Sequence, residues 1–281
     1  MATIAATEAN ELTPSRDDEA AMPRTDLLFQ RDSALRQIET QVMEAASDGR
    51  RVALAATVFY PGGGGQPCDT GALFRLSDGQ KWPVTSVNKE GEVVWHELGG
   101  EDPPPKPGDL VRGEIDWATR HKLMRMHTAL HVLCGVVFRD FGALVTGGNM
   151  GPDRARMDFE MDSAEFTPER VTEIERRANE EIALGRDVRV RILPREEAFQ
   201  IPDLIRTKIN LLPEGITEVR IVEIVGLDLQ ADGGTHVANT REVGRLRVVG
   251  TRSKGKANKR LEIELDEPEA SASDRSGSDV R

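Results

Sequence analysis

Cysteine, long apolar runs and a secretory signal are scarce or missing in this chain of 281 residues. The two cysteines, Cys68 and Cys134, are too few for a disulfide framework. No apolar run approaches the roughly 18–20 residues that span a bilayer. The N-terminus lacks a basic segment followed by an apolar one, which is the pattern of a secretory signal. We therefore expect a cytoplasmic protein with no membrane partner.

Nucleotide-binding and covalent catalytic motifs are missing too. A glycine run precedes Gln66 and Pro67, whereas a phosphate-binding Walker loop needs Lys and then Ser or Thr after its last glycine. No GxGxxG motif stands between a strand and a helix, so no nucleotide cofactor is expected. No Ser-His-Asp or Cys-His set argues for a covalent intermediate.

The net charge of −11 is distributed unevenly. Residues 1–22 contain five acidic residues against one basic, and residues 266–281 contain five against two. Because both segments are polar and rich in small residues, we expect two disordered tails. Residues 241–260, in contrast, contain eight basic residues against Glu242 alone. A phosphate backbone responds to this local charge, so the segment is either an RNA contact or a solvated face.

The first half of the chain, residues 23–115, has the pattern of short β-strands. Apolar runs such as residues 51–59 and 92–98 are separated by turn sequences that contain Gly, Pro, Asn or Asp. This spacing predicts a small, glycine-rich domain that resembles a β-barrel. Residues 26–43 are expected to lead into it as a short strand and a helix.

The second half, residues 116–265, combines helices and strands. An apolar helix of about 22 residues is expected after Asp116, which is a suitable N-cap. A second helix is expected from Thr167, with Pro168 in its first turn, to about Leu184. The strand candidates are residues 187–193, 218–226, 244–250 and 260–265. The fold class is therefore α+β, with an antiparallel sheet packed by two long helices.

The first of these helices carries two histidines at positions i and i+4, His127 and His131. Their Cβ atoms lie roughly 5–6 Å apart on one face, so both imidazoles can reach one cation. A zinc-protease motif would need Glu directly after the first histidine, but Thr128 stands there. A glycine turn about 100 residues later contains Asp232 and His236. These four side chains form a ligand set that suits zinc.

Several segments, in order, resemble motifs of one family: the editing domain of alanyl-tRNA synthetase and its free-standing relatives, the AlaX trans-editing proteins. The segments are FYPGGGGQPCDTG at 59–71, HTALH at 127–131, VTGGNMGPDRARMDF at 145–159, GGTHVANT at 233–240 and SKGKANKR at 253–260. The resemblance covers roughly residues 25–265. A β domain before the editing part, without an aminoacylation domain, is typical of the medium-length class.

The resemblance implies a metal-dependent hydrolase that removes the wrong amino acid from mischarged tRNA(Ala). A synthetase pocket made for alanine cannot strongly exclude glycine, which lacks one methyl worth about 1–3 kcal/mol, or serine, which adds a hydroxyl. Ser-tRNA(Ala) is the expected chief substrate, with Gly-tRNA(Ala) as a second. One divalent metal per chain, zinc, is the expected cofactor, and whether it activates water or only positions the substrate stays open.

One residue departs from the family pattern, which usually has Cys four residues before the loop histidine. Asp232 occupies this position. An aspartate oxygen binds zinc at about 2.0–2.2 Å, but it is a harder ligand than thiolate, so it weakens zinc binding and relaxes discrimination among divalent metals. We assign Asp232 as the fourth ligand. The alternative is that it only caps the turn and that water completes a site of three protein ligands.

The resemblance also implies roles for residues around the metal. Gln66 is expected near the aminoacyl ester and Thr128 near the serine hydroxyl, and both are assigned as catalytic. The glycines whose backbone is expected to line the pocket are Gly63, Gly64, Gly65, Gly233 and Gly234. The basic residues expected to contact the acceptor end of the tRNA are Arg252, Lys254, Lys256, Lys259 and Arg260.

Two other functions fit the same residues. A site closed by four protein ligands resembles a structural one, so the chain could be a metal-stabilised tRNA-binding module without catalysis. It could also hydrolyse a different mischarged tRNA, such as Ser-tRNA(Thr).

Overall fold

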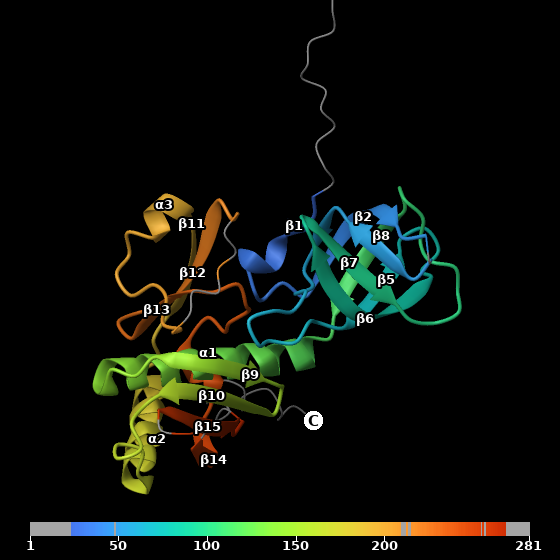
Figure 1. Cartoon of the computed structure of the whole chain (residues 1–281). Helices are drawn as coiled ribbons and strands as arrows, with labels where there is room; N and C mark the ends of the chain where they lie inside the picture. Colours follow the sequence, from blue (N-terminus) through green and yellow to red (C-terminus); the bar gives the residue numbers. More distant parts are fainter. Residues whose placement is uncertain are drawn as a thin grey trace, which may run out of the picture.

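The computed structural model describes residues 24–267, except residues 48, 209–211, 213, 214, 254 and 256. The predicted tails at 1–22 and 266–281 lie outside the described residues, apart from Asp266 and Glu267. The α+β class is confirmed. Figure 1 shows a barrel at the upper right, a long helix across the middle and a sheet on either side of that helix. No helix in the described part of the chain is long and apolar enough to cross a membrane.

The first half forms a closed barrel of six antiparallel strands. Around the barrel the order is β2 (Gln37–Ala45), β3 (Arg51–Leu54), β7 (Val93–Leu98), β6 (Lys81–Glu90), β5 (Gly71–Arg75) and β8 (Leu110–Ile115). The inward-facing side chains, among them Val52, Leu73, Trp82 and Val111, form a core of their own. Closure leaves the sheet without exposed edges.

The expected helix within residues 26–43 was wrong. The chain forms a short strand, β1 (Asp26–Leu27), which pairs with β4 (Ala56–Thr57), then one 3-10 turn, η1 (Leu28–Gln30), and then β2. Glu, Gln and Met favour helices, which made the helical interpretation reasonable. In β2, however, Thr40 and Val42 point inward, and the strand pairs with β8 and β3, so closing the barrel outweighs the local preference.

The second half is built around α1 (Trp117–Phe141), whose N-cap Asp116 accepts a side-chain hydrogen bond from the backbone N–H of Thr119. Nearly every face of its middle is buried. One sheet packs against it in the order β14 (Leu246–Ser253), β15 (Asn258–Leu265), β10 (Arg154–Glu160) and β9 (Val145–Met150). The other long helix, α2 (Pro168–Ala183), packs against α1 and β14.

A second, three-stranded sheet lies on the other side of α1 (Figure 1). Its order is β11 (Val188–Pro194), β12 (Glu218–Ile224) and β13 (Asp228–Ala231). Two short helices complete the fold, α3 (Arg195–Ala198) after β11 and η2 (Thr240–Val243) after the glycine turn. The sequence predicted one sheet here, but the four strand candidates divide between two sheets, and α1 between them buries a face of each.

Arg120, in the first turns of α1, ties the two halves together. Its side chain is fully buried and forms an ion pair with Asp69 of the barrel half. It also donates to the backbone carbonyls of Ser33 at 3.0 Å and Val58 at 2.6 Å. A buried charge is tolerated only when it is paired and hydrogen-bonded, so these contacts fix the barrel against the start of α1.

Candidate metal centre and substrate cavity

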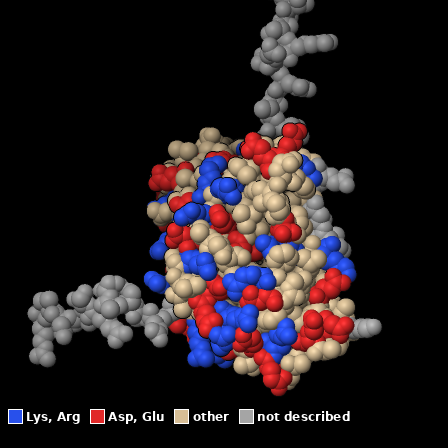
Figure 2. All heavy atoms as spheres, turned by 90° about the vertical axis from the view of Figure 1, so that its left-hand side faces the viewer, with Lys and Arg blue, Asp and Glu red and all other residues tan. Residues whose placement is uncertain are grey.

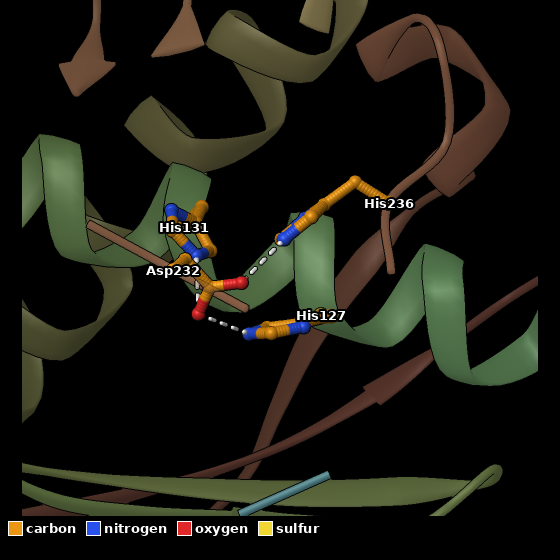
Figure 3. A group of neighbouring side chains, drawn as sticks. All are labelled: His127, His131, Asp232 and His236. Atoms are coloured by element: carbon orange, nitrogen blue, oxygen red, sulfur yellow. Dashed lines mark hydrogen bonds and ion pairs between the residues drawn. The ribbon is translucent and has the colours of Figure 1, made fainter. Parts of the chain in front are cut away.

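The four predicted ligands meet at one point. His127 and His131 come from the middle of α1, whereas Asp232 and His236 come from the turn that follows β13. One donor atom from each lies within 4.8 Å of the others. Figure 3 shows the three imidazoles converging on the Asp232 carboxylate, which lies between them.

The donor spacing fits a single ion. Asp232 Oδ2 lies 3.4 Å from His127 Nε2 and 3.8 Å from His131 Nε2, and Asp232 Oδ1 lies 3.0 Å from His236 Nε2. Ligand bonds of about 2.0–2.2 Å in a tetrahedral site place donor atoms about 3.3–3.6 Å apart. The distances from Asp232 are near this range, and the largest separation within the donor set, 4.8 Å, is small enough for side-chain rotation to bring the four donors around one zinc-sized ion.

Each histidine has an acceptor behind its Nδ1 atom. The pairs are His127 with Gln66 Oε1 at 3.0 Å, His131 with Asp228 Oδ2 at 2.9 Å, and His236 with Thr128 Oγ1 at 3.5 Å. An acceptor at Nδ1 keeps the proton there and leaves the lone pair on Nε2, which faces the centre. This arrangement holds metal-binding histidines in the right tautomer and orientation.

Gln66 and Thr128, both assigned as catalytic from the sequence, lie behind the histidines. Gln66 is 3% exposed and Thr128 is fully buried, and neither lines the cavity described below. The amide of Gln66 donates to Thr235 Oγ1 at 2.8 Å, so its oxygen is the atom that faces His127. Thr128 Oγ1 accepts from the backbone N–H of Val237 at 3.2 Å. The contacts of Gln66 and Thr128 are therefore with the candidate ligands and with the turn that contains His236.

The position of Asp232 is compatible with both roles that the sequence left as alternatives. Its Oδ1 atom accepts from the backbone N–H of Gly234 at 2.7 Å and so caps the turn, while Oδ2 faces the two helix histidines. Burial acts to raise the pKa of this carboxyl, but His127 and the other two histidines outweigh it and hold the pKa well below its usual range. Asp232 is therefore an ionised carboxylate.

Two histidines of the cluster have pKa values shifted in opposite directions. Burial acts to lower the pKa of His131, but Asp228 and Asp232 outweigh it and raise the pKa to about 9. Burial and the neighbouring His127 hold the pKa of His236 well below its usual range. An imidazole binds a cation only when its Nε2 has no proton, so the raised pKa of His131 would make metal binding weaker at low pH.

A cavity of about 440 Å³ opens beside the cluster. His127, His131 and Asp232 form one wall, and β9 and the glycine run form others. Of the five predicted pocket glycines, Gly64 and Gly65 line this cavity, whereas Gly63, Gly233 and Gly234 do not. The backbone carbonyl of Gly65 accepts from Met150 N–H at 3.0 Å, so the barrel half contributes directly to the cavity wall.

Gly234 instead lies against the side chain of His127, where there is no room for a Cβ atom. A Cβ atom at this position would lie 2.5 Å from His127 Nδ1 and 2.7 Å from Gln66 Oε1. Real Cβ atoms essentially never come so close to other heavy atoms. Only glycine lets the turn pass under the hydrogen bond between these two side chains.

The five predicted tRNA contacts differ in exposure. Arg252 is exposed, whereas Lys254 and Lys256 lie outside the described residues. Lys259 is buried and donates to two serines and a backbone carbonyl, and Arg260 is buried in an ion pair with Asp158. Lys259 and Arg260 are thus less available to a phosphate than the sequence indicated.

No broad field of one sign is visible on the face in Figure 2, where Lys and Arg side chains lie among Asp and Glu. On α2, for example, Arg176 pairs with Glu173 and Glu180. Such pairs neutralise each other at short range.

The sequence analysis missed Asp228 and Gln230. Asp228, Gln230 and Asp232 alternate along β13 and its end, so their side chains share the face toward α1. Leu229 and Ala231 point the other way, into the small core under α3. The sequence DLQAD has this period of two, but the strand predicted from the sequence ends at residue 226 and the next begins at residue 244.

Comparison with known proteins agrees with these features. Residues 219–262 match the threonyl and alanyl tRNA synthetase second additional domain, and residues 19–119 match the class II (A) tRNA synthetases. The chain is 40% identical to the alanyl-tRNA editing protein AlaX-M of Methanosarcina barkeri, covering 86% of this chain and 99% of the relative. It is 38% identical to AlaX-M of Saccharolobus solfataricus, covering 84% and 97%.

A longer relative contains the same region. Alanine–tRNA ligase of Ignicoccus hospitalis is 37% identical over 82% of this chain, which corresponds to 25% of the ligase. The AlaX-M proteins, in contrast, are matched over nearly their whole length. The chain therefore belongs to the AlaX-M family of alanyl-tRNA editing proteins, related to the editing region of alanyl-tRNA synthetase.

Proposed function

We propose that this protein is a trans-editing deacylase, which hydrolyses the ester between a wrongly attached amino acid and the 3′-terminal ribose of tRNA(Ala). Serine is the chief amino acid removed and glycine the second. The observation that carries the proposal is the convergence of three imidazoles and one carboxylate, of which His127, His131 and Asp232 form a wall of a cavity of about 440 Å³. A cavity of this size holds an aminoacyl group and the end of a ribose, while the rest of a tRNA stays outside.

His127, His131, Asp232 and His236 would hold one divalent metal, with zinc as the expected ion. When bound, such an ion supplies a Lewis acid that polarises the ester carbonyl. Gln66, Asp228 and Thr128 act as positioning residues, because each holds one imidazole by its Nδ1 atom. We thus assign Gln66 and Thr128 to ligand orientation, in place of contact with the substrate.

The apolar walls of the cavity restrict water around the ester. Leu130, Val145 and Met157 line it together with the backbone of β9 and the glycine run. Electrostatic interactions with the reacting atoms are stronger in such a site than in bulk water. We expect Arg252, Lys254 and Lys256 to contact phosphates of the acceptor end, and we expect the reaction to take place in the cytoplasm, where tRNA is charged.

The test is a deacylation assay with four substrates: Ser-tRNA(Ala), Gly-tRNA(Ala), Ala-tRNA(Ala) and Ser-tRNA(Thr). Hydrolysis of the first two, with Ala-tRNA(Ala) spared and activity lost on chelation, is the expected result. Binding of tRNA without hydrolysis of any of the four would mean a non-catalytic module. Preferential hydrolysis of Ser-tRNA(Thr) would mean a different substrate for the same site.

A further inference from the structure

The side-chain amide of Gln230 is held by hydrogen bonds on one side and borders the cavity on the other. It lies on β13 between Asp228 and Asp232, and its side chain lines the cavity next to His131. The amide nitrogen Nε2 donates to Asp228 Oδ2 at 2.7 Å and to Cys134 Sγ at 3.3 Å. Both N–H groups of the amide are therefore used on the protein side.

The orientation of this amide follows from its neighbour Asp228, whose oxygen can only accept a hydrogen bond. Asp228 Oδ2 is a carboxylate oxygen, which only accepts, and it already accepts from His131 Nδ1 at 2.9 Å. If the amide were flipped, its oxygen would face a carboxylate without a proton between them. The nitrogen must consequently face Asp228, and the oxygen Oε1 must point away from it.

Oε1 of Gln230 has no hydrogen-bond partner among the residues that the structure describes. It is also not one of the buried polar atoms left without a partner, which include Asp228 Oδ1. An acceptor that is neither paired nor sealed off, on a side chain that lines the cavity, is open to whatever enters it. The surrounding wall is largely apolar, so this oxygen is a specific polar feature.

We propose that Gln230 Oε1 accepts a hydrogen bond from the α-ammonium group of the aminoacyl ester, and that the site therefore selects esters with a free α-amino group. This inference rests on the proposed deacylase function. The buried carboxylate of Asp228 polarises the amide through its N–H, which makes Oε1 more negative. A polarised oxygen favours a cationic donor, because charge-assisted hydrogen bonds are about twice as strong as neutral ones.

The charged groups around the amide are consistent with this assignment. Asp228 is fully buried, and Arg206 Nε lies 4.0 Å from its other oxygen, too far for a hydrogen bond. Lys208, at the edge of the cavity, pairs with Glu160 at 2.6 Å. The carboxylate behind Gln230 is thus shared between the amide of Gln230 and Nδ1 of His131, with Arg206 farther away.

Three substrates separate this role from the alternatives: Ser-tRNA(Ala), Gly-tRNA(Ala) and the α-hydroxy analogue of Ser-tRNA(Ala) obtained by nitrous acid deamination. The analogue keeps the serine side chain and the ester but replaces the ammonium with a neutral hydroxyl. The variants are Gln230→Met, which keeps the side-chain volume, and Gln230→Leu as a second replacement. Ratios of kcat/KM between substrates are taken within one preparation, so the fraction of folded, metal-loaded protein cancels.

We expect Gln230→Met to lose about 10- to 100-fold in kcat/KM on Ser-tRNA(Ala) and by the same factor on Gly-tRNA(Ala), with a much smaller loss on the analogue. A loss confined to the two serine substrates would overturn the proposal, because the partner would then be the side-chain hydroxyl. Equal losses on all three substrates would also overturn it, since Gln230 would only support Asp228 and His131. If the wild-type protein hydrolysed neither Ser- nor Gly-tRNA(Ala), the proposed function would fail first, independently of any variant.

Discussion

Replacing Gly234 with alanine tests whether the backbone of the turn sets the position of His127. The added Cβ would lie 2.5 Å from His127 Nδ1 and 2.7 Å from Gln66 Oε1, whereas ordinary contacts are about 3.5–4.0 Å. One side must therefore move by about 1 Å, which breaks the 3.0 Å hydrogen bond between these two side chains. Overpacking of this kind costs about 1–3 kcal/mol of stability. Loss of the partner behind a metal ligand lowers metal affinity about 10- to 100-fold.

Gly233→Ala is the matched control, because nothing lies within 4 Å of a Cβ at that position. Zinc affinity is measured for both variants and the wild type by competition with a chelator of known affinity, and stability by urea denaturation of the metal-free proteins. Gly233→Ala should resemble the wild type in both assays, while Gly234→Ala should bind zinc more weakly. If Gly234→Ala bound zinc as tightly as Gly233→Ala, the close packing under His127 would have no bearing on the site.

Substitutions at four further residues test one side chain each. Asp228→Asn removes the anionic acceptor behind His131 Nδ1 and should weaken zinc binding about 10- to 100-fold in the same chelator assay, and an unchanged affinity would refute that role. Asp232→Cys should raise zinc affinity and disfavour harder ions such as Mn²⁺, whereas Asp232→Ala should lower zinc affinity; equal affinity in wild type and Asp232→Ala would show that the carboxylate is not a ligand. Burial lowers the pKa of His96 from 6.5 to about 4, so the unfolded chain takes up a proton first as the pH falls, and stability present above pH 6.5 is lost toward pH 4. In urea titrations this residue should account for about 3 kcal/mol of the loss in the free energy of unfolding between pH 6.5 and pH 4. His96→Gln should make that free energy less dependent on pH, and an unchanged pH dependence would show that the pKa of His96 is not lowered. Arg252→Glu should raise KM for tRNA and reduce the slope of its logarithm against salt by about one, and an unchanged slope would exclude a phosphate contact.

The sequence was sufficient to place two of the four candidate ligands side by side because helical geometry is regular. His127 and His131 had to share a face of α1, and the buried surroundings of that helix followed from its apolar composition. The direction of each imidazole was not predictable in this way. It depends on acceptors from three different segments, and Gln66 lies 61 residues from His127 along the chain.

The division of the second half into two sheets was also not predictable from strand patterns. Each strand candidate has the same alternation whichever sheet it joins, and the assignment depends on which face of α1 covers it. The short strand β13 was missed because Gly233 and Gly234 follow it directly and made the whole segment resemble a loop. Its polar residues, Asp228 and Gln230, would be unusual on a face toward a buried helix unless they served a site there.

The barrel is connected to the metal cluster by hydrogen bonds as well as by packing. Gln66 holds His127, and Arg220 of β12 donates to the backbone carbonyl of Gln30 at 2.8 Å and to that of Asp232 at 2.9 Å. Two candidate ligands, one on α1 and one in the glycine turn, are therefore held in part from the barrel half. A hydrogen bond weakens steeply with distance, so a shift of about 1 Å between the halves would release both contacts.

Because of this coupling, the second half needs the barrel to form the site. The second half contains all four candidate ligands, yet without the barrel His127 would lose its orienting acceptor and the cavity would lose the wall formed by Gly64 and Gly65. The buried ion pair of Arg120 with Asp69 holds the interface at the start of the helix that carries both histidines. Changes at that ion pair should therefore alter the site from a distance, because they move the acceptor relative to the ligand.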